Sequence, residues 1–307
     1  SLAKSYLHEN HQVTVLDDLS SGKDSNISAF HNQPNFQFIR GSILDKNLVG
    51  RLVGEVDVCF HFAAALGVQK ILSNPIDSLR TNIQGSENVL FSAFERRTPV
   101  VLASTSEIYG KNSKMPLHED SDRLLGTPNI LRWSYSEAKA IDETLAFALS
   151  RNSDWDVKIL RFFNTVGPSQ NSSYGMVIPN FCRAAIKNQE LVIYGSGSQS
   201  RVFLHVADAV RAIRMLERCD LASGRAVNVG GLEEITILQL AEKIINLANS
   251  SSKISFVPYE KLRGEGYEDI ERRVPDISLI KNLVSWEPEI SLDEILSQCI
   301  ESALNGG

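Results

Sequence analysis

The first two-thirds of the sequence alternates short apolar runs with longer amphipathic stretches, and this alternation restricts the possible folds more than any other feature. The runs that predict strands are Val13–Leu16, Asn35–Ile39, Val56–Phe62, Pro99–Ala103 and Asp156–Phe163. The stretches that predict helices are Ser1–Asn10, Ser78–Phe94 and Ser134–Ser150. Strands and helices in this order favour an α/β fold with a parallel sheet covered by helices on both faces.

The pattern changes after residue 168, where Gly, Ser and Asn become more frequent. Further helices are predicted at Val177–Asn188, Val206–Arg218, Thr236–Ala248 and Leu292–Ala303, with short strands between them. We therefore predict a Rossmann-like doubly wound sheet in residues 1–168 and a smaller C-terminal α/β lobe for the substrate in residues 169–307. Some segments of the lobe are expected to return to the first domain.

Small or polar residues follow the ends of several predicted strands, among them Asp17, Thr105 and Asn164. Ligands of open parallel sheets bind at this edge. An acidic residue such as Asp17 suits the 2′-hydroxyl of an NAD ribose and repels the 2′-phosphate of NADP. A carboxylate that caps the turn after the strand explains Asp17 equally well, so both readings stay open.

One part of a dinucleotide fold is missing from the sequence. Such a fold begins with a strand and a Gly-rich loop whose backbone amides approach the pyrophosphate. Here the first residues already read as the helix that follows that loop. We expect the natural protein to extend upstream by one strand and one Gly-rich turn, and we expect weak or absent NAD binding without them.

Tyr135 and Lys139 are four residues apart in a predicted helix, so their side chains share one face. A nearby positive charge favours the phenolate of a tyrosine, whose ordinary pKa is about 10. A tyrosine activated in this way could act as a general base toward a sugar hydroxyl. Alone, the pair is a weak signal, and an ordinary exposed helix explains it about as well.

Composition excludes several other classes of function. The net charge of −6 provides no basic field for nucleic acid or an anionic membrane. No apolar run is long enough to cross a membrane. The four cysteines are far apart and the histidines lack metal-ligand spacing, which argues against a metal site and a disulfide framework. These features favour a reducing, cytoplasmic location.

Several motifs together resemble a known family. They are His61-Phe62-Ala63-Ala64, Asn82, Ser104–Gly110, Tyr135 with Lys139, Arg161–Pro168, Val192–Arg201 and Arg273–Asp276. Nearly the whole chain resembles the extended short-chain dehydrogenases/reductases that act on nucleotide sugars. This family includes UDP-glucose 4-epimerases, UDP-glucuronate decarboxylases and dTDP-glucose 4,6-dehydratases.

The resemblance implies an NAD-dependent enzyme that transiently oxidises C4 of a UDP-sugar. Thr105 and Tyr135 would bind and deprotonate the C4 hydroxyl, Lys139 would hold the nicotinamide ribose, and Glu107 would manage proton transfer. The implied cofactor-binding residues are Asp17, Ser42, Ile43, Ala63, Ala64, Asn82, Tyr135, Lys139 and Phe163. The implied substrate-binding residues are Ser106, Asn164, Leu191, Tyr194, Arg201 and Arg273.

The resemblance also bears on the fate of the 4-keto sugar. Dehydratases resemble Thr-Asp-Glu where this chain has Thr105-Ser106-Glu107, so dehydration is disfavoured. Thr-Ser-Glu with Arg273 resembles the decarboxylases, whereas Arg132-Trp133-Ser134 is closer to epimerase-like relatives. A UDP-glucuronate decarboxylase is the preferred prediction and a UDP-sugar 4-epimerase the alternative. A homodimer is usual for the family, and a non-catalytic NAD-binding protein stays open because fold does not fix function.

Overall fold

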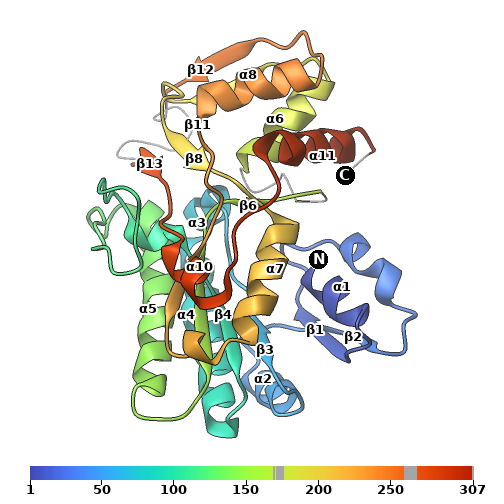
Figure 1. Cartoon of the computed structure of the whole chain (residues 1–307), viewed down its shortest axis with the longest axis vertical. Coiled ribbons are helices and arrows are strands. Elements are labelled where there is room, and N and C mark those ends of the chain that lie inside the picture. Colours follow the sequence, from blue (N-terminus) through green and yellow to red (C-terminus); the bar gives the residue numbers. More distant parts are fainter. Residues whose placement is uncertain (169, 171–175, 259–267, 306–307) are drawn as a thin grey trace.

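The computed structural model describes residues 1–168, 170, 176–258 and 268–305 (Figure 1). The strands are β1 Val13–Asp17, β2 Phe36–Arg40, β3 Cys59–His61, β4 Val100–Thr105, β5 Val157–Phe162, β6 Thr165–Val166, β7 Leu191–Tyr194, β8 Ser200–Val202, β9 Leu204–His205, β10 Ala226–Val229, β11 Glu234–Thr236, β12 Ile254–Val257 and β13 Arg272–Arg273. The helices are α1 Leu2–Leu7, α2 Lys46–Val53, α3 Val68–Ser73, α4 Pro75–Arg96, α5 Ser134–Ser150, α6 Val177–Ile186, α7 Val206–Glu217, α8 Ile237–Leu247, α10 Ser278–Val284 and α11 Leu292–Leu304. Single turns of 3₁₀ helix include η3 Ser106–Tyr109 and η4 Leu131–Trp133.

The central sheet is parallel, with the strand order β10-β5-β4-β3. Strands β1 and β2 form a separate parallel pair, and no ladder joins β1 to β3 within the described residues. The α/β class, the parallel sheet and the Rossmann-like arrangement are therefore confirmed.

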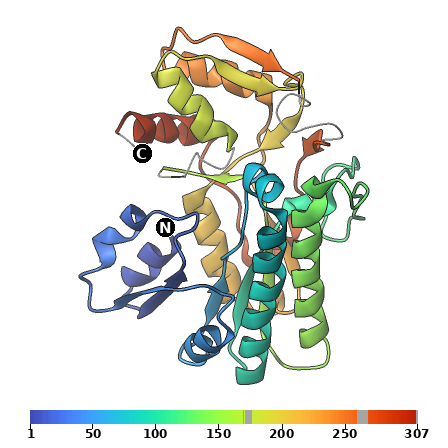
Figure 2. The same cartoon turned by 180° about the vertical axis from the view of Figure 1, so that it is seen from behind.

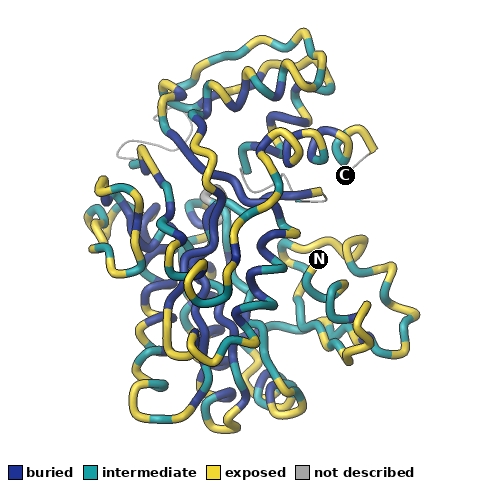
Figure 3. Tube along the Cα trace, viewed as in Figure 1, coloured by how far each residue is buried: buried dark blue, intermediate teal, exposed yellow. Residues whose placement is uncertain are grey.

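Helices cover both faces of the central sheet (Figures 1 and 2). Successive strand residues point to opposite faces. Val100 and Leu102 of β4 accordingly pack in one cluster with residues of α2, α4 and α5, whereas Val101 packs in another with α7 and α10. Burial on both sides explains why these strands read as continuous apolar runs. Figure 3 shows β4, β5 and β10 buried, while β1 and β2 remain largely part-exposed.

A second core lies in the C-terminal lobe, where α6, α8 and α11 pack with β7. Helix α8 begins with a capping box: the Thr236 hydroxyl accepts from the Gln239 amide at 3.2 Å, and the Gln239 side chain accepts from the Thr236 amide at 3.1 Å. The predicted domain boundary at residue 168 stays a prediction. Three later elements nevertheless pack with the first domain, because β10 pairs with β5 and both α7 and α10 cover the sheet.

In the part of the chain that the structure describes, no helix has the length and apolarity needed to span a membrane. Within the same residues, no group of three or more His, Cys, Asp or Glu side chains could hold a metal ion.

Candidate active site

A cavity of about 1080 Å³ lies between the carboxyl ends of the sheet strands and the C-terminal lobe. Its wall on the sheet side includes Thr105, Ser106, Glu107, Tyr135 and Lys139. Asn164, which follows β5, also lines it, and the lobe contributes Tyr194, Arg201 and Arg273. The structure thus gathers at one cavity residues that are up to 168 positions apart in the sequence.

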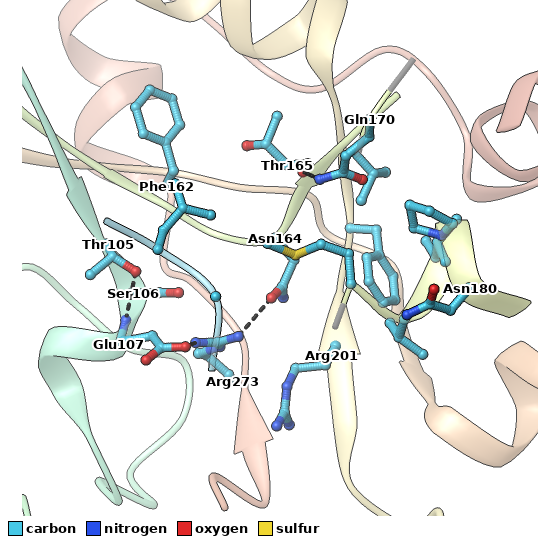
Figure 4. Close-up of a pocket in the computed structure, with 18 of the residues that line it drawn as sticks. Thr105, Ser106, Glu107, Phe162, Asn164, Thr165, Gln170, Asn180, Arg201 and Arg273 are labelled. Carbon is cyan, nitrogen blue, oxygen red and sulfur yellow. Dashed lines mark hydrogen bonds and ion pairs between the residues drawn. The ribbon is translucent and has the colours of Figure 1, made fainter. Parts of the chain in front are cut away.

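The turn after β4 holds the Thr105-Ser106-Glu107 motif in place. The Thr105 hydroxyl accepts a hydrogen bond from the Glu107 amide at 3.2 Å and caps η3. From α5, the Ser136 hydroxyl donates to the Glu107 carbonyl at 2.8 Å. These two contacts fix the backbone from which the Thr105 and Glu107 side chains reach the cavity (Figure 4).

Tyr135 and Lys139 lie in the first turns of α5, and both line the cavity. The structure differs from the expected activation of Tyr135 by Lys139. Burial, followed by the negative charges of Glu107 and Asp142, raises the pKa of Tyr135 above its ordinary value. One reason for the raised pKa is that Lys139 pairs with Asp142 and not with the phenol of Tyr135. The Nζ atom of Lys139 lies 3.1 Å from Asp142 Oδ2.

Asp142 belongs to a buried chain of hydrogen bonds that sequence analysis missed. Its Oδ2 also accepts from the Ser86 hydroxyl at 2.9 Å, and Ser86 Oγ lies 3.0 Å from His61 Nε2. Burial, aided by the charge of Lys139, lowers the pKa of His61 to about 3, so its ring is neutral at pH 7. The sequence feature that could have predicted this contact is the position of Asp142, three residues after Lys139 on the same helix.

Replacing Asp142 with Asn is expected to move the rising limb of the pH–kcat profile to lower pH. Asp142 raises the pKa of Tyr135, and its neutralisation also leaves the Lys139 charge uncompensated, so both effects favour the phenolate. Steady-state kinetics between pH 6 and roughly 10, the ordinary pKa of tyrosine, would measure the shift. The exposed Asp293→Asn variant is the control, and a limb that moves to higher pH would contradict this account.

The Glu107 carboxylate lies between two arginines. Its Oε2 is 2.6 Å from Arg132 Nη1, and its Oε1 is 3.4 Å from Arg273 Nη1. Burial acts to raise the pKa of Glu107, but the two guanidinium groups outweigh it and lower the pKa from 4.5 to about 2. Glu107 is therefore an ionised acceptor at neutral pH. Its pairing stabilises the fold above about pH 4.5, and this contribution is lost as the pH falls toward 2.

Arg273 and Arg201 lie side by side on paired strands at the lobe end of this cluster. Arg273 Nη2 donates to Asn164 Oδ1 at 2.6 Å. Burial and the nearby charge of Arg201 lower the pKa of Arg273 to about 10, which still leaves it protonated at pH 7. Arg201 Nη2 is 3.2 Å from Asp269 Oδ1. Two buried arginines at a cavity wall suit a phosphate or carboxylate ligand.

The remaining predicted substrate residues are Tyr194, Leu191 and Ser106, and two of them line the cavity. Tyr194 lines it together with Val192 and Ile193. Leu191 does not line it, because its side chain is fully buried in the core of the lobe. Ser106 is almost fully buried and lines the cavity beside Thr105.

The residues predicted to bind the cofactor divide into two groups. Ala64, Tyr135 and Lys139 line the cavity, whereas Asp17, Ser42, Ile43, Ala63, Asn82 and Phe163 are not part of its wall. The side chains of three of these make local contacts instead. Asp17 Oδ1 accepts from the Leu19 amide at 2.6 Å, Ser42 Oγ accepts from the Leu44 amide at 3.2 Å, and Ile43 packs in the core.

Asn82 acts on the cavity through the loop after β3. Its side-chain amide accepts from the Ala65 amide at 2.7 Å and donates to the Ala65 carbonyl at 2.9 Å. Phe163 is fully buried against Tyr109, while its neighbour Phe162 lines the cavity. The alternation of side chains therefore places one phenylalanine in the core and the other at the site.

The sheet side of the cavity fits the nicotinamide end of NAD. Lys139 supplies a cation for ribose hydroxyls, Tyr135 supplies a phenol, and Ala64, Phe62 and Phe162 supply small or apolar surface. No described residue forms a Gly-rich phosphate loop here, so we assign the pyrophosphate to none of them.

Comparisons with known proteins identify the family of the chain. Residues 1–299 match the family model described as GDP-mannose 4,6 dehydratase. The chain is 38% identical over 303 residues to UDP-N-acetyl-alpha-D-glucosaminuronate decarboxylase of Bacillus cytotoxicus, covering 98% of this chain and 92% of that protein. It is 34% identical over 302 residues to UDP-glucuronic acid decarboxylase 1 of Danio rerio, covering 98% and 68%.

A solved structure shows the same fold. UDP-glucuronic acid 4-epimerase from Bacillus cereus, in complex with UDP-glucuronic acid and NAD, superposes with a TM-score of 0.88 at 23% identity, over 99% of this chain and 95% of that one. The family resemblance drawn from the sequence motifs is confirmed. The chain belongs to the GDP-mannose 4,6-dehydratase family, within the extended short-chain dehydrogenases/reductases that modify nucleotide sugars.

Proposed function

We propose that this protein is an NAD-dependent decarboxylase of a UDP-linked hexuronic acid. The observation that carries the proposal is the buried Arg273, which lines the cavity within 3.4 Å of Glu107, on the wall that also presents Thr105 and Tyr135. This arrangement provides a base for the C4 hydroxyl and a cation for the C6 carboxylate of the same sugar. Similarity to two UDP-uronate decarboxylases, at 38% and 34% identity, supports it.

The residues of the chain divide the work as follows. Thr105 binds the C4 oxygen, and Tyr135, acting as its phenolate, takes the C4 hydroxyl proton and becomes the neutral phenol. Lys139 orients the ribose, while its charge is paired with Asp142. Bound NAD supplies a reversible hydride acceptor for C4. The resulting 4-keto uronate is a β-keto acid, so its C5–C6 bond breaks with loss of CO2 and leaves an enolate that takes a proton from water at C5. Return of the hydride to C4, with the proton held by Tyr135, would then give the UDP-pentose.

Arg273 would hold the carboxylate until the bond breaks, and the ionised Glu107 would accept a hydrogen bond from the sugar. The low pKa of Glu107 refines the role that sequence analysis gave it, because a group ionised at pH 7 cannot donate the first proton. Electrostatic positioning by the arginines is therefore the main contribution of this end of the cavity.

A UDP-sugar 4-epimerase is the alternative, favoured by the fold shared with a 4-epimerase. An epimerase would retain the carboxylate and present the other face of the ketone to the reduced cofactor. The same Thr105, Tyr135 and Lys139 would serve both reactions, so the distinction depends on the groups around C6.

The test is an incubation of the full natural chain with NAD and, separately, UDP-glucuronate, UDP-N-acetylglucosaminuronate and UDP-glucose. We expect CO2 and a UDP-pentose from at least one of the two acids and no turnover of UDP-glucose. Formation of a 4-epimer without CO2 would establish the alternative, and turnover of none of the three would reject both. Heat-inactivated protein is the control.

We also propose a cytoplasmic homodimer. Support for the dimer comes from α4 and α5, which pack side by side and expose Phe91 and Ile141 at 37% and 48%. Apolar side chains on adjacent helices suit the pairing of two copies across a two-fold axis.

A further inference from the structure

Arg273 has donor capacity that the protein leaves unused. Its Nη2 is satisfied by Asn164 at 2.6 Å, while its contact with Glu107 is a long ion pair of 3.4 Å (Figure 4). Its Nε is buried and has no partner among the described residues. A buried donor without an acceptor is costly, so this guanidinium is poised for a further anion.

Glu107 is the carboxylate that could pair with Arg273 within the cavity wall, but it lies closer to Arg132. The Glu107–Arg132 contact is 2.6 Å, against 3.4 Å to Arg273. Arg132 also lines the cavity, although only 4% of its surface is exposed. A carboxylate and a guanidinium with nothing between them would ordinarily close into a two-pronged pair.

The local fold fixes Arg132 independently of any ligand. It lies in η4, and the Ser134 hydroxyl after this turn donates a hydrogen bond to the Leu131 carbonyl at 2.8 Å. Its guanidinium stacks 5.2 Å from the ring centre of the fully buried Trp133. Trp133 Nε1 in turn donates to Glu268 Oε2 at 2.8 Å.

We propose that Arg132 is a positioning residue that holds the Glu107 carboxylate away from Arg273, so that Arg273 keeps free donors for the carboxylate of the sugar. Arg132 thereby makes the site selective for an acidic sugar over a neutral one. The identity of the incoming anion rests on the proposed function, whereas the competition between Glu107 and the ligand rests on the geometry of the three side chains.

The test compares wild type with Arg132→Met in two measurements. In the crystal structure of the variant, Glu107 is expected to close onto Arg273 with two short hydrogen bonds. By calorimetry in the presence of NAD, the Kd for UDP-glucuronate is expected to rise about 10- to 100-fold, whereas the Kd for UDP-glucose changes by less than about 3-fold.

Two further variants separate positioning from general damage. Arg132→Met combined with Glu107→Gln should recover most of the lost affinity for UDP-glucuronate, because a neutral amide competes weakly for Arg273. Arg132→Lys, which keeps the positive charge, should retain part of the preference for UDP-glucuronate over UDP-glucose. A purely structural role for Arg132 would give no recovery on mutation of Glu107, and that result overturns the inference.

Failure of the inference and failure of the proposed function give different results. If wild type binds UDP-glucuronate no more tightly than UDP-glucose, the acidic substrate is wrong and the selectivity assigned to Arg132 is wrong with it. If wild type prefers the acid and Arg132→Met keeps that preference in full, or if Glu107 does not move in the variant structure, only the role of Arg132 is wrong.

Discussion

Replacing Tyr135 with Phe is expected to lower kcat by about 10²- to 10⁴-fold, the usual effect of removing a general base. The change deletes a single oxygen atom. Among the described residues, the Tyr135 hydroxyl makes no hydrogen bond, so its removal leaves no partner unsatisfied. The variant should therefore fold with nearly unchanged stability and bind the UDP-sugar with a similar Kd.

This split between catalysis and binding is measured by single-turnover kinetics alongside calorimetry with UDP-glucuronate. Tyr6→Phe is the matched control, because Tyr6 Oη contacts Glu217 at 3.4 Å and Tyr6 does not line the cavity. A Tyr135→Phe enzyme that keeps wild-type kcat would contradict the assignment of Tyr135 as the base.

Replacing Arg161 with Met is expected to destabilise the fold by about 3–5 kcal/mol, the usual cost of removing one partner from a buried ion pair. Arg161 Nη2 lies 2.7 Å from Glu143 Oε2, and both side chains are less than a tenth exposed. Arg161 Nη1 also donates to the Tyr109 hydroxyl at 2.9 Å and to the Glu119 carbonyl at 2.7 Å. The variant would leave the Glu143 charge buried with the Ser104 hydroxyl as its remaining donor.

Urea denaturation followed by circular dichroism would measure this loss as a fall in the free energy of unfolding. The control is Arg272→Met, which removes an exposed pair with Glu234 and should change stability by only a small fraction of that amount. A double variant, Arg161→Met with Glu143→Leu, should cost less than Arg161→Met alone, because no charge is left behind. Equal losses in the buried and exposed variants would contradict the account.

The sequence predicts the regular elements of this fold well because the apolar periodicity is strong. Helix α5 has the predicted bounds, and α6, α7, α8 and α11 differ from their predicted ends by at most two residues. Strand β3 is shorter than expected, at Cys59–His61, because its flanks leave the ladder with β4. Such ends depend on the partner strand, which the local sequence does not contain.

The site was predictable as a set of residues but not as a set of contacts. Motifs placed Thr105, Tyr135 and Lys139 at one cavity, since they follow strand ends or share a helical face. The partners of charged groups depend on residues distant in the sequence, such as Glu107 with Arg132 and Arg273. For the same reason, the sequence analysis interpreted Arg132-Trp133-Ser134 only as a resemblance to epimerase-like relatives and did not predict the contact of Arg132 with Glu107.

Helix α5 carries four functional residues whose positions depend on a single rotational phase. Tyr135 and Lys139 line the cavity and Asp142 pairs with Lys139. Glu143 contacts Ser104 of β4 and Arg161 of β5. Inserting one residue after Lys139 would turn all later positions by about 100° and uncouple both buried networks at once. Substitutions on the outer face of α5 should therefore be tolerated, whereas insertions and deletions within the helix should abolish activity. The length of α5 is thus more strongly constrained than the identity of most of its residues.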